Sequence, residues 1–434
     1  MKKKLVALLV LSLSIMAVGC GEDKETIAGM NGSAIESGSF ADNFTQETES
    51  LTTDSTETAD GTENHEETEP ETIPEPEPYV EPEVDLVMVG DVLMHMRVTN
   101  SGKQEDGTYN FDKLFEPTKE MIEAADVAII NQEIIMAGEE YGYSGYPTFN
   151  TPTALADSIV NAGFDVVLHA TNHTLDKRAQ GALNCINYWE TNFPDIAVLG
   201  MYDNQEERDT IYVYEQDGIR IAILNYTYGT NGIPVPADMP YIVNLMDKTL
   251  IKADVEKAKE LADFIVVCPH WGTEYTHKPT QAQKDWSDFF LECGVDLVIG
   301  THPHVIEPVE WVENEEGDRM LVYYSLGNFI NSSASKGAGV GARFVGAMAT
   351  VKIAKSEEGE VYIKEYGAEP LVTYVSGNGK TIVTYPMEEF TSEMALESSV
   401  HEKDPTFTYE YCLQLWEDVF GNLEEKEQEE VTGQ

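Results

Sequence analysis

Cysteine is scarce in this chain, and its spacing excludes two common kinds of cysteine site. The 434 residues include five cysteines, and no two of them form a CxxC pair. The chain therefore lacks the motifs of a zinc knuckle and of a thioredoxin-like redox site. Cys268 and Cys293 lie in or beside apolar segments, so we interpret them as small buried apolar residues. A disulfide among these two, Cys185 and Cys412 stays open as an alternative.

Basic residues are few as well, and this limits the partners that the chain can bind. It has 27 lysines and arginines against 78 aspartates and glutamates, for a formal net charge of −51 at pH 7. We expect no nucleic-acid partner, because phosphate binding needs basic patches. An anionic polymer would be repelled at long range unless bound cations mediated the contact.

The apolar run at the N-terminus is too short to cross a membrane comfortably, and it has the features of a targeting segment. Lysines at positions 2–4 precede the apolar residues 5–18, which end in Ala17-Val18-Gly19-Cys20. Small residues directly before a cysteine resemble a bacterial lipobox. We therefore expect residues 1–20 to be a lipoprotein signal peptide. Lipidated Cys20 would hold the protein on the extracellular face of the bacterial cell membrane, and an ordinary signal peptide with an incidental cysteine is the alternative.

Composition divides the rest of the chain into three parts. Residues 21–83 are rich in Glu, Thr, Ser, Gly and Pro and poor in apolar residues, which predicts a disordered acidic tether. Residues 84–420 carry the apolar segments of a folded domain. Residues 421–434 form an acidic tail.

Strands and helices alternate along the predicted domain. Apolar runs predict strands over 84–89, 126–130, 164–169, 210–215, 219–226, 264–268, 295–299, 320–325 and 343–353. Helical patterns cover 111–125, 151–162, 176–191, 250–262, 281–293 and 409–420. This alternation indicates an α/β domain, in which the later strands fit a second, more antiparallel sheet.

Several of the predicted strands are followed by residues that can bind a metal. These residues are Asp91, Glu133, Asn172, His173, Asp176, His270, His302 and His304. Ligands bind at such strand ends in open α/β sheets, and two divalent cations need several carboxylate, imidazole and amide donors. Each residue alone has a structural explanation, such as a turn for an aspartate after glycine. The joint pattern nevertheless indicates a metal site, and His302 and His304, two apart in an extended segment, should both face it.

Six motifs, in this order, resemble those of the CapA family, which is linked to poly-γ-glutamate capsule biosynthesis. They are Gly90–Met94, Asn131–Glu133, Thr171–Asp176, His270–Gly272, Gly300–His304 and Tyr324–Phe329. The resemblance covers residues 84–335. The family in turn resembles calcineurin-like metallophosphoesterases, which implies a four-layer αββα sandwich with a two-metal site.

The resemblance also implies which residues hold the two divalent ions, with Mn, Zn and Fe as candidates. Asp91 and His304 would hold the first ion, and Glu133 would bridge it to the second. The further ligands of the second ion would be Asn172, His270 and His302. The metals would activate water for attack on phosphorus.

The remaining roles include two departures from the phosphoesterase pattern. His173, oriented by Asp176, would be the general acid or an electrostatic stabiliser. The phosphoesterase pattern has a histidine two residues after its first aspartate, where this chain has Leu93, and His95 has a different spacing. The bridging aspartate is replaced by Glu133. We therefore expect the first metal site to be weak or empty.

Two functions are compatible with these residues. The first is a lipid-anchored, CapA-like enzyme of poly-γ-glutamate or related envelope-polymer biosynthesis, a metal-dependent hydrolase or transferase. The second is a non-catalytic factor that binds the anionic polymer or assembles with a membrane-bound polyglutamate synthase. The expected partners are poly-γ-glutamate or another anionic envelope polymer, subunits of a membrane synthase, and the membrane itself.

Some residues near these motifs have two interpretations. Trp271, Tyr275 and Tyr324 are either core aromatics or the wall of a substrate groove. Asn328 either orients a ligand or a metal-binding histidine, or caps a loop. The glycine-rich residues 337–341 lack the strand–turn–helix context of a dinucleotide loop, and we expect a flexible loop there.

Overall fold

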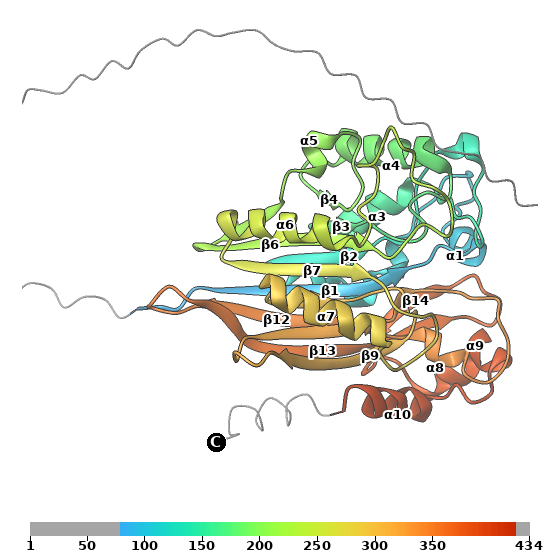
Figure 1. The fold of residues 1–434 in the computed structure, drawn as a ribbon. Helices are drawn as coiled ribbons and strands as arrows, with labels where there is room; N and C mark the ends of the chain where they lie inside the picture. The colour runs from blue at the N-terminus through green and yellow to red at the C-terminus, as the bar shows by residue number, and fades with distance from the viewer. Residues whose placement is uncertain (1–78, 422–434) are drawn as a thin grey trace, which may run out of the picture. The chain divides into compact units, whose positions relative to one another are not determined.

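The computed structural model describes residues 79–421 (Figure 1). The predicted signal peptide, with Cys20, lies outside the described residues. So do residues 21–78 of the predicted tether and residues 422–434 of the predicted tail. Within 79–421, no helix is long and apolar enough to cross a membrane.

The first sheet combines parallel and antiparallel strands. Its strands are β1 Glu83–Val92, β2 Val127–Asn131, β3 Val166–Leu168, β4 Ala197–Leu199, β11 Asn328–Ile330, β12 Val345–Lys355, β13 Val361–Val375 and β14 Ile382–Pro386. Their order is β14-β13-β12-β1-β2-β3-β4, and β11 pairs with β1. β1 to β4 are parallel, whereas β12, β13 and β14 join the other side of β1 as antiparallel strands.

The second sheet is mainly parallel. Its strands are β5 Val213–Gln216, β6 Ile219–Thr227, β7 Phe264–His270, β8 Leu297–Ile299, β9 Ile306–Glu313 and β10 Arg319–Leu326. Their order is β5-β6-β7-β8-β10-β9. The four central strands are parallel, and only the edge strands β5 and β9 are antiparallel to their neighbours.

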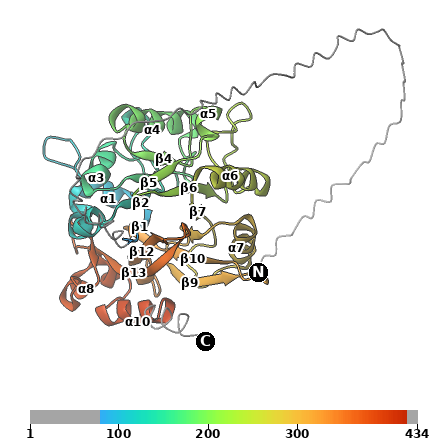
Figure 2. The same ribbon diagram turned by 90° about the vertical axis from the view of Figure 1, so that its left-hand side faces the viewer.

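Helices cover the outer faces of the two sheets. They are α1 Met96–Ser101, α2 Lys119–Glu123, α3 Ala154–Ala162, α4 Arg178–Asn192, α5 Gln205–Arg208, α6 Lys248–Leu261, α7 Gln281–Cys293, α8 Ser392–Glu397, α9 Ser399–Lys403 and α10 Tyr409–Val419. Short 3₁₀ turns occupy 112–114, 116–118, 139–141 and 341–344. Figure 2 shows α3, the first sheet, the second sheet, and α6 with α7 as successive layers. The α/β fold with a four-layer αββα sandwich is confirmed.

Strand β7 explains why two sheets share one interior. Val266 and Cys268 belong to the core cluster that also contains β1 and α3. Ile265 and Val267, which alternate with them along the strand, belong to the cluster shared with α6 and α7. Successive residues of a strand point to opposite faces, so β7 faces the first sheet on one side and helices on the other. Cys268 Sγ lies 3.8 Å from Met88 Sδ of β1, which brings the sheets into direct contact.

Helix α7 begins and ends where local sequence predicts. Thr280 and Gln283 form a capping box at its start, and Gly294 ends it with a φ of 81°. Such caps satisfy the free backbone groups of the first and last turns. The predicted helix over 281–293 is therefore confirmed to the residue. The helix predicted from Thr151 begins later, because Thr153 is its N-cap residue.

Three sequence-based expectations need correction or completion. The late strand over 343–353 does not enter the second sheet, because β12 pairs with β1 of the first. The helix predicted over 111–125 is two 3₁₀ turns followed by the short α2, with Pro117 in the second turn. Proline lacks the backbone N–H that a continuous helix needs. The cysteines within residues 79–421 are all free, and Cys293 is half-buried whereas the others are buried.

Candidate metal centre

The predicted site residues come from the carboxyl ends of parallel strands in both sheets. Asp91 lies in β1 and Glu133 two residues beyond β2, in the first sheet. Asn172 follows β3, which also belongs to the first sheet. His270 ends β7 and His302 follows β8, and both of these strands belong to the second sheet. Because the sheets pack face to face, these strand ends meet at one edge of the sandwich. We call the following residues the donor cluster: Asp91, Glu133, Asn172, His270, His302 and His304.

One half of the donor cluster surrounds Asp91. His304 Nδ1 lies 2.9 Å from Asp91 Oδ2 and 3.7 Å from Glu133 Oε2. Asn131 donates a hydrogen bond of 2.8 Å to Asp91 Oδ1, and the backbone N–H of His302 donates to the same carboxylate at 3.3 Å. The Asp91 carboxylate is therefore held in one orientation while it faces an imidazole nitrogen.

The other half surrounds His270. Its Nε2 atom lies 3.0 Å from Asn172 Oδ1 and 3.7 Å from Glu133 Oε1. Its Nδ1 atom lies 3.0 Å from Thr301 Oγ1, a contact that fixes the orientation of the ring. The rings of His270 and His302 have their centroids 4.8 Å apart. Glu133 thus presents one oxygen to each half, which is the geometry of a bridging ligand.

Several buried atoms of the donor cluster lack hydrogen-bond partners within the described residues. They include both carboxylate oxygens of Glu133 and Nδ1 of His302. Glu133, His302 and His304 each offer a ligand atom, and these atoms lie within 4.8 Å of one another. Buried polar groups without partners are costly. Because carboxylate, imidazole and amide donors are those that divalent metals prefer, the cluster fits a metal site.

Burial sets the protonation of these groups in the metal-free protein. It lowers the pKa of His270 and of His302 well below the ordinary value, with nearby histidines adding to the effect. Both rings are therefore neutral, which is the form that binds metals. Burial also raises the pKa of Glu133 well above its ordinary value, against the opposing effect of His304. For His304 the carboxylates of Glu133 and Asp91 outweigh burial and raise its pKa to about 9.

His173 is oriented beside the donor cluster by Asp176. Its Nδ1 atom lies 2.7 Å from Asp176 Oδ2, which also accepts a 2.6 Å hydrogen bond from the backbone N–H of Phe149. Its Nε2 atom lies 3.9 Å from Glu133 Oε1. The ring therefore presents Nε2 to the cluster, as predicted for a residue that moves a proton there.

The two histidines of the last motif reach the site by a route that the sequence did not predict. His302 has a φ of 100° and His304 a φ of 60°, so the segment is not extended. Positive φ is unfavourable for residues with a side chain and is typical of functional sites. The rings nevertheless lie with centroids 5.6 Å apart. The prediction that both rings face one site is confirmed, although the reason given for it is wrong.

A cavity of about 620 Å³ opens beside His304. Its lining includes Arg97, Tyr275, Asn331 and Arg343. His304 of the donor cluster is among its lining residues, so this cavity reaches the cluster.

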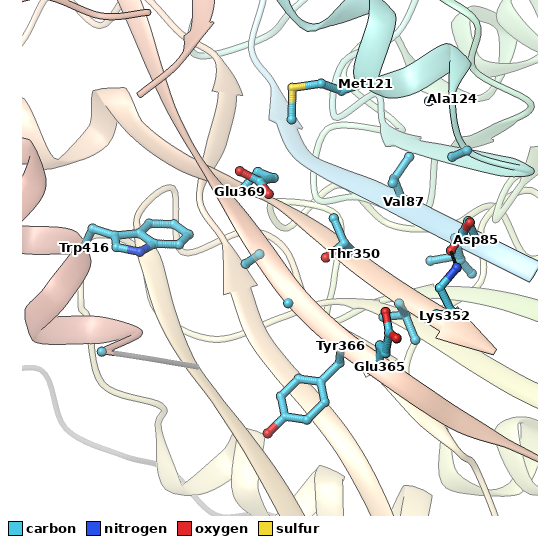
Figure 3. Close-up of a pocket in the computed structure, with 16 residues that line it drawn as sticks. Asp85, Val87, Met121, Ala124, Thr350, Lys352, Glu365, Tyr366, Glu369 and Trp416 are labelled. Atoms are coloured by element: carbon cyan, nitrogen blue, oxygen red, sulfur yellow. Dashed lines mark hydrogen bonds and ion pairs between the residues drawn. The ribbon is translucent and has the colours of Figure 1, made fainter. Parts of the chain in front are cut away.

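A second cavity, of about 600 Å³, lies elsewhere and has a different character (Figure 3). Met121 of α2 and Trp416 of α10 border it, and strands β1, β12 and β13 form its floor. Of its charged residues, Lys352 and Asp85 form an ion pair of 2.6 Å. None of the described residues that line it is a predicted site residue, so it offers no comparable chemistry.

Comparison with known proteins decides the family. The model of the family described as "Bacterial capsule synthesis protein PGA_cap" matches residues 85–333. The chain belongs to this family of capsule synthesis proteins. It is 26% identical over 254 residues to the capsule biosynthesis protein CapA of Bacillus anthracis, which covers 56% of this chain and 59% of that protein. It is 26% identical over 245 residues to the PGA biosynthesis protein CapA of Bacillus subtilis (strain 168), which covers 56% of this chain and 62% of that protein.

The matched region therefore spans less than two thirds of these relatives. Among solved structures, the chain is similar to the NAD nucleotidase of Haemophilus influenzae, with a TM-score of 0.40, 11% identity and coverage of 79% and 57% of the two chains. It is also similar to the calcineurin-like phosphoesterase YfkN of Bacillus subtilis, with a TM-score of 0.39, 12% identity and coverage of 67% and 91%. Similarity at this level carries no statement about chemistry.

The structure of this PGA_cap protein does not supply the histidine that the phosphoesterase pattern has at the position of Leu93, and His95 does not replace it. Leu93 is buried and lines the cavity. The ring of His95 packs against Phe149 with centroids 5.3 Å apart, and among the described residues it forms no ion pair with a carboxylate of the donor cluster. The first half of the cluster thus has the side chains of Asp91, Glu133 and His304, without the additional histidine of the phosphoesterase pattern.

The open interpretations of neighbouring residues are now resolved. Trp271 and Tyr324 are buried core residues, whereas Tyr275 is 45% exposed and lines the cavity. Asn328 donates 3.0 Å and 2.9 Å hydrogen bonds to the backbone carbonyls of His304 and Arg343, so it holds the loop that carries His304.

The sequence analysis did not identify two residues that support the donor cluster, Asn131 and Thr301. Asn131 orients Asp91, and Thr301 orients His270. Both lie inside the motifs already singled out, so their position was the available signal. Arg343, which lines the cavity from outside the motifs, had no such signal.

Proposed function

We propose that this chain is a metal-dependent hydrolase or group-transfer enzyme that acts on an anionic polymer of the cell envelope, with poly-γ-glutamate as the first candidate. The observation that carries the proposal is Glu133, whose two buried oxygens lack hydrogen-bond partners among the described residues and face imidazole nitrogens in different halves of the donor cluster. A buried polar group without hydrogen bonds costs free energy even beside a charged neighbour. A cation in each half would supply the missing partners.

The donor cluster divides into two ligand sets. Asp91 and His304 would hold one ion together with Glu133. The second ion would be held by Glu133, Asn172, His270 and His302. Bound divalent ions would supply Lewis-acid activation of the reacting oxygens.

The chain itself supplies proton transfer and orientation. Asp176 holds Nδ1 of His173, so Nε2 is the atom that can give a proton to the leaving group. Thr301 and Asn131 keep His270 and Asp91 aligned without touching the substrate. The cavity beside His304 admits the polymer from one side of the cluster.

A non-catalytic role has one observation in its favour. Leu93 occupies the position of a metal-binding histidine, so the first ion has fewer ligands than in a phosphoesterase. With a weak first site, the protein would bind the polymer through one cation and support a membrane-bound synthase. Anchoring through Cys20 on the extracellular face of the membrane is part of both proposals, and its support is the N-terminal sequence.

Metal content tests the site directly. We expect about one to two divalent ions per full-length chain by elemental analysis after incubation with manganese or zinc, about one if the weak first site stays empty, and a clear loss in His302→Ala. His401→Ala is the matched control, because His401 is a half-buried histidine whose Nδ1 contacts the carbonyl of Phe407, outside the cluster. A wild-type chain that takes up no metal would refute the metalloenzyme.

Turnover separates the enzyme from the assembly factor. With phosphoesters and γ-glutamate oligomers as substrates, His173→Ala should lower kcat by about 10²- to 10⁴-fold, the usual contribution of a general acid, and leave the metal content unchanged. Asp176→Asn should cause a smaller loss, because it disturbs only the orientation of His173. If His173→Ala supports polymer formation in cells as well as the wild type does, the non-catalytic role is correct.

A further inference from the structure

A short exposed turn after β6 contacts the donor cluster, and none of the six motifs contains it. Strand β6 ends at Thr227, and the backbone N–H of Tyr228 donates a 3.0 Å hydrogen bond to the carbonyl of His270. Residues 228–232 follow, with Tyr228 and Asn231 exposed to solvent. We call these five residues, 228–232, the β6 turn.

The local sequence fixes the shape of the β6 turn. The backbone N–H of Ile233 donates a 2.9 Å hydrogen bond to the carbonyl of Thr230, which closes a turn of four residues. Its two central residues have positive φ, 50° for Asn231 and 72° for Gly232. Asn-Gly is the sequence that such turns prefer, because both residues tolerate positive φ. The place of the Asn231 side chain therefore follows from its neighbours in the sequence.

Asn231 holds the amide of Asn172 in one of its two orientations. Asn172 Nδ2 donates a 3.3 Å hydrogen bond to Asn231 Oδ1. On its other side, Asn172 Oδ1 faces Nε2 of His270 at 3.0 Å. An amide can bind a cation through its oxygen, whereas a rotation by about 180° would present the NH₂ group, which only donates. Asn231 therefore favours the orientation in which Asn172 can act as a metal ligand.

The β6 turn contacts two further side chains of the site. The ring of Tyr228 lies over that of His302, with centroids 4.7 Å apart. Asn231 Nδ2 lies 3.4 Å from His173 Nδ1, the nitrogen that Asp176 orients. The turn therefore reaches two of the residues assigned to the second ion and also the residue assigned to proton transfer.

We propose that the β6 turn positions the ligands of the second ion, with Asn231 and Tyr228 as its positioning residues. Asn231 sets the orientation of the Asn172 amide, and Tyr228 restricts the ring of His302. Residues that orient metal ligands typically change metal affinity by about 10- to 100-fold when they are replaced. This inference rests on the proposed function for the assignment of Asn172 and His302 to the second ion. In the alternative, the turn only covers the site, and its side chains have no effect on affinity.

The opposite end of β6 offers a matched control. Asp217 and Gly218 join β5 to β6, with φ of 51° and 81°. The nine residues of β6 separate this turn from the β6 turn by roughly 25–30 Å. Asn231→Gly and Asp217→Gly each remove an exposed side chain at nearly the same φ, and glycine accepts that φ without strain. A difference between them therefore reports the contacts of Asn231 with the site.

The test is competition for zinc between the chelator-stripped full-length chain and a chelator, with cobalt(II) absorption as a second readout. Asn231→Gly should weaken binding of one ion by about 10-fold and change the cobalt(II) spectrum, which reports ligand geometry. Asn231→Asp keeps an acceptor for Asn172 and tolerates positive φ, so it should bind nearly as the wild type does. Asp217→Gly should match the wild type in both readouts.

Tyr228 gives an independent second measurement. Tyr228→Ala removes the ring that lies over His302, and it should weaken binding of the same ion by about 10-fold. Tyr228→Phe keeps the ring and should lose less. If Asn231→Gly fails to fold by circular dichroism, this pair of variants replaces it in the same assay.

The outcomes distinguish this inference from the proposed function. Unchanged zinc affinity and an unchanged cobalt(II) spectrum in Asn231→Gly, or an equal loss in Asp217→Gly, would overturn the inference and leave the metalloenzyme intact. A loss confined to the β6 turn variants, in a protein without turnover, would sustain the inference and refute the enzyme. A wild-type chain that binds neither metal would refute both.

Discussion

Replacing Glu133 by glutamine should have opposite effects on stability with and without metal. In the metal-free protein, both oxygens of Glu133 are buried without hydrogen-bond partners among the described residues. Burial outweighs the attraction of His304 in its effect on the pKa of Glu133. Glutamine has the same shape and no charge, so Glu133→Gln removes the net cost of burying this carboxyl group. That cost is on the order of 1–3 kcal/mol. The melting temperature of the metal-free variant should therefore rise by about 2–6 °C.

With metal the order should reverse. An ion at 100 times its Kd stabilises the folded state by about 2.7 kcal/mol, so two ions would contribute about 5 kcal/mol to the wild type. The variant lacks the bridging carboxylate and should gain little. The wild type should then exceed it by about 2–4 kcal/mol, by difference of these two estimates.

The assay is differential scanning calorimetry of both full-length proteins, first with chelator and then with manganese or zinc. Glu307→Gln is the matched control, because Glu307 is fully buried but lies outside the donor cluster and accepts from Gln283 at 2.6 Å. Its stability should differ from the wild type by the same amount with and without metal. A Glu133→Gln protein that is less stable than the wild type in chelator would refute the reasoning.

Three further predictions follow from the described contacts. Burial raises the pKa of Asp296 to about 6, so the free energy of unfolding should fall as the pH rises from 4 to 6. In urea titrations at several pH values, Asp296→Asn should remove up to about 3 kcal/mol of that fall. Asn328→Ala frees the loop of His304 and should weaken metal binding about 10- to 100-fold by competition with a chelator, and unchanged affinity would contradict that role. Gly90→Ala would place a Cβ 2.0 Å from the carbonyl oxygen of Gly327, so it should lower the free energy of unfolding in urea by about 1–3 kcal/mol. Gly218→Ala is the control: its Cβ meets no atom within 4 Å, so it tests the strain of a positive φ alone.

The chemistry of the site could be read from the sequence because it depends on residue type and on local position. Carboxylate, amide and imidazole groups placed just after apolar runs indicate donors at strand ends, and Asp91, Glu133 and His270 lie there. Helix α7 matches the range predicted from its helical pattern to the residue, and its caps, Thr280 and Gly294, are local features that fix these ends. The alternation of strands and helices identified the α/β class for the same reason.

Tertiary structure alone decided which strands are neighbours and which distant side chains meet. An apolar run does not say which sheet edge it joins, so β12 was assigned to the wrong sheet and in fact pairs with β1. The positive φ angles of His302 and His304 are imposed by the packed surroundings and not by their own preferences. The stacking of Arg343 on Tyr275, which are far apart in the sequence, depends on the same long-range packing. Sequence therefore determined the donors of this protein, whereas the packing of two sheets determined their geometry and the cavity beside them.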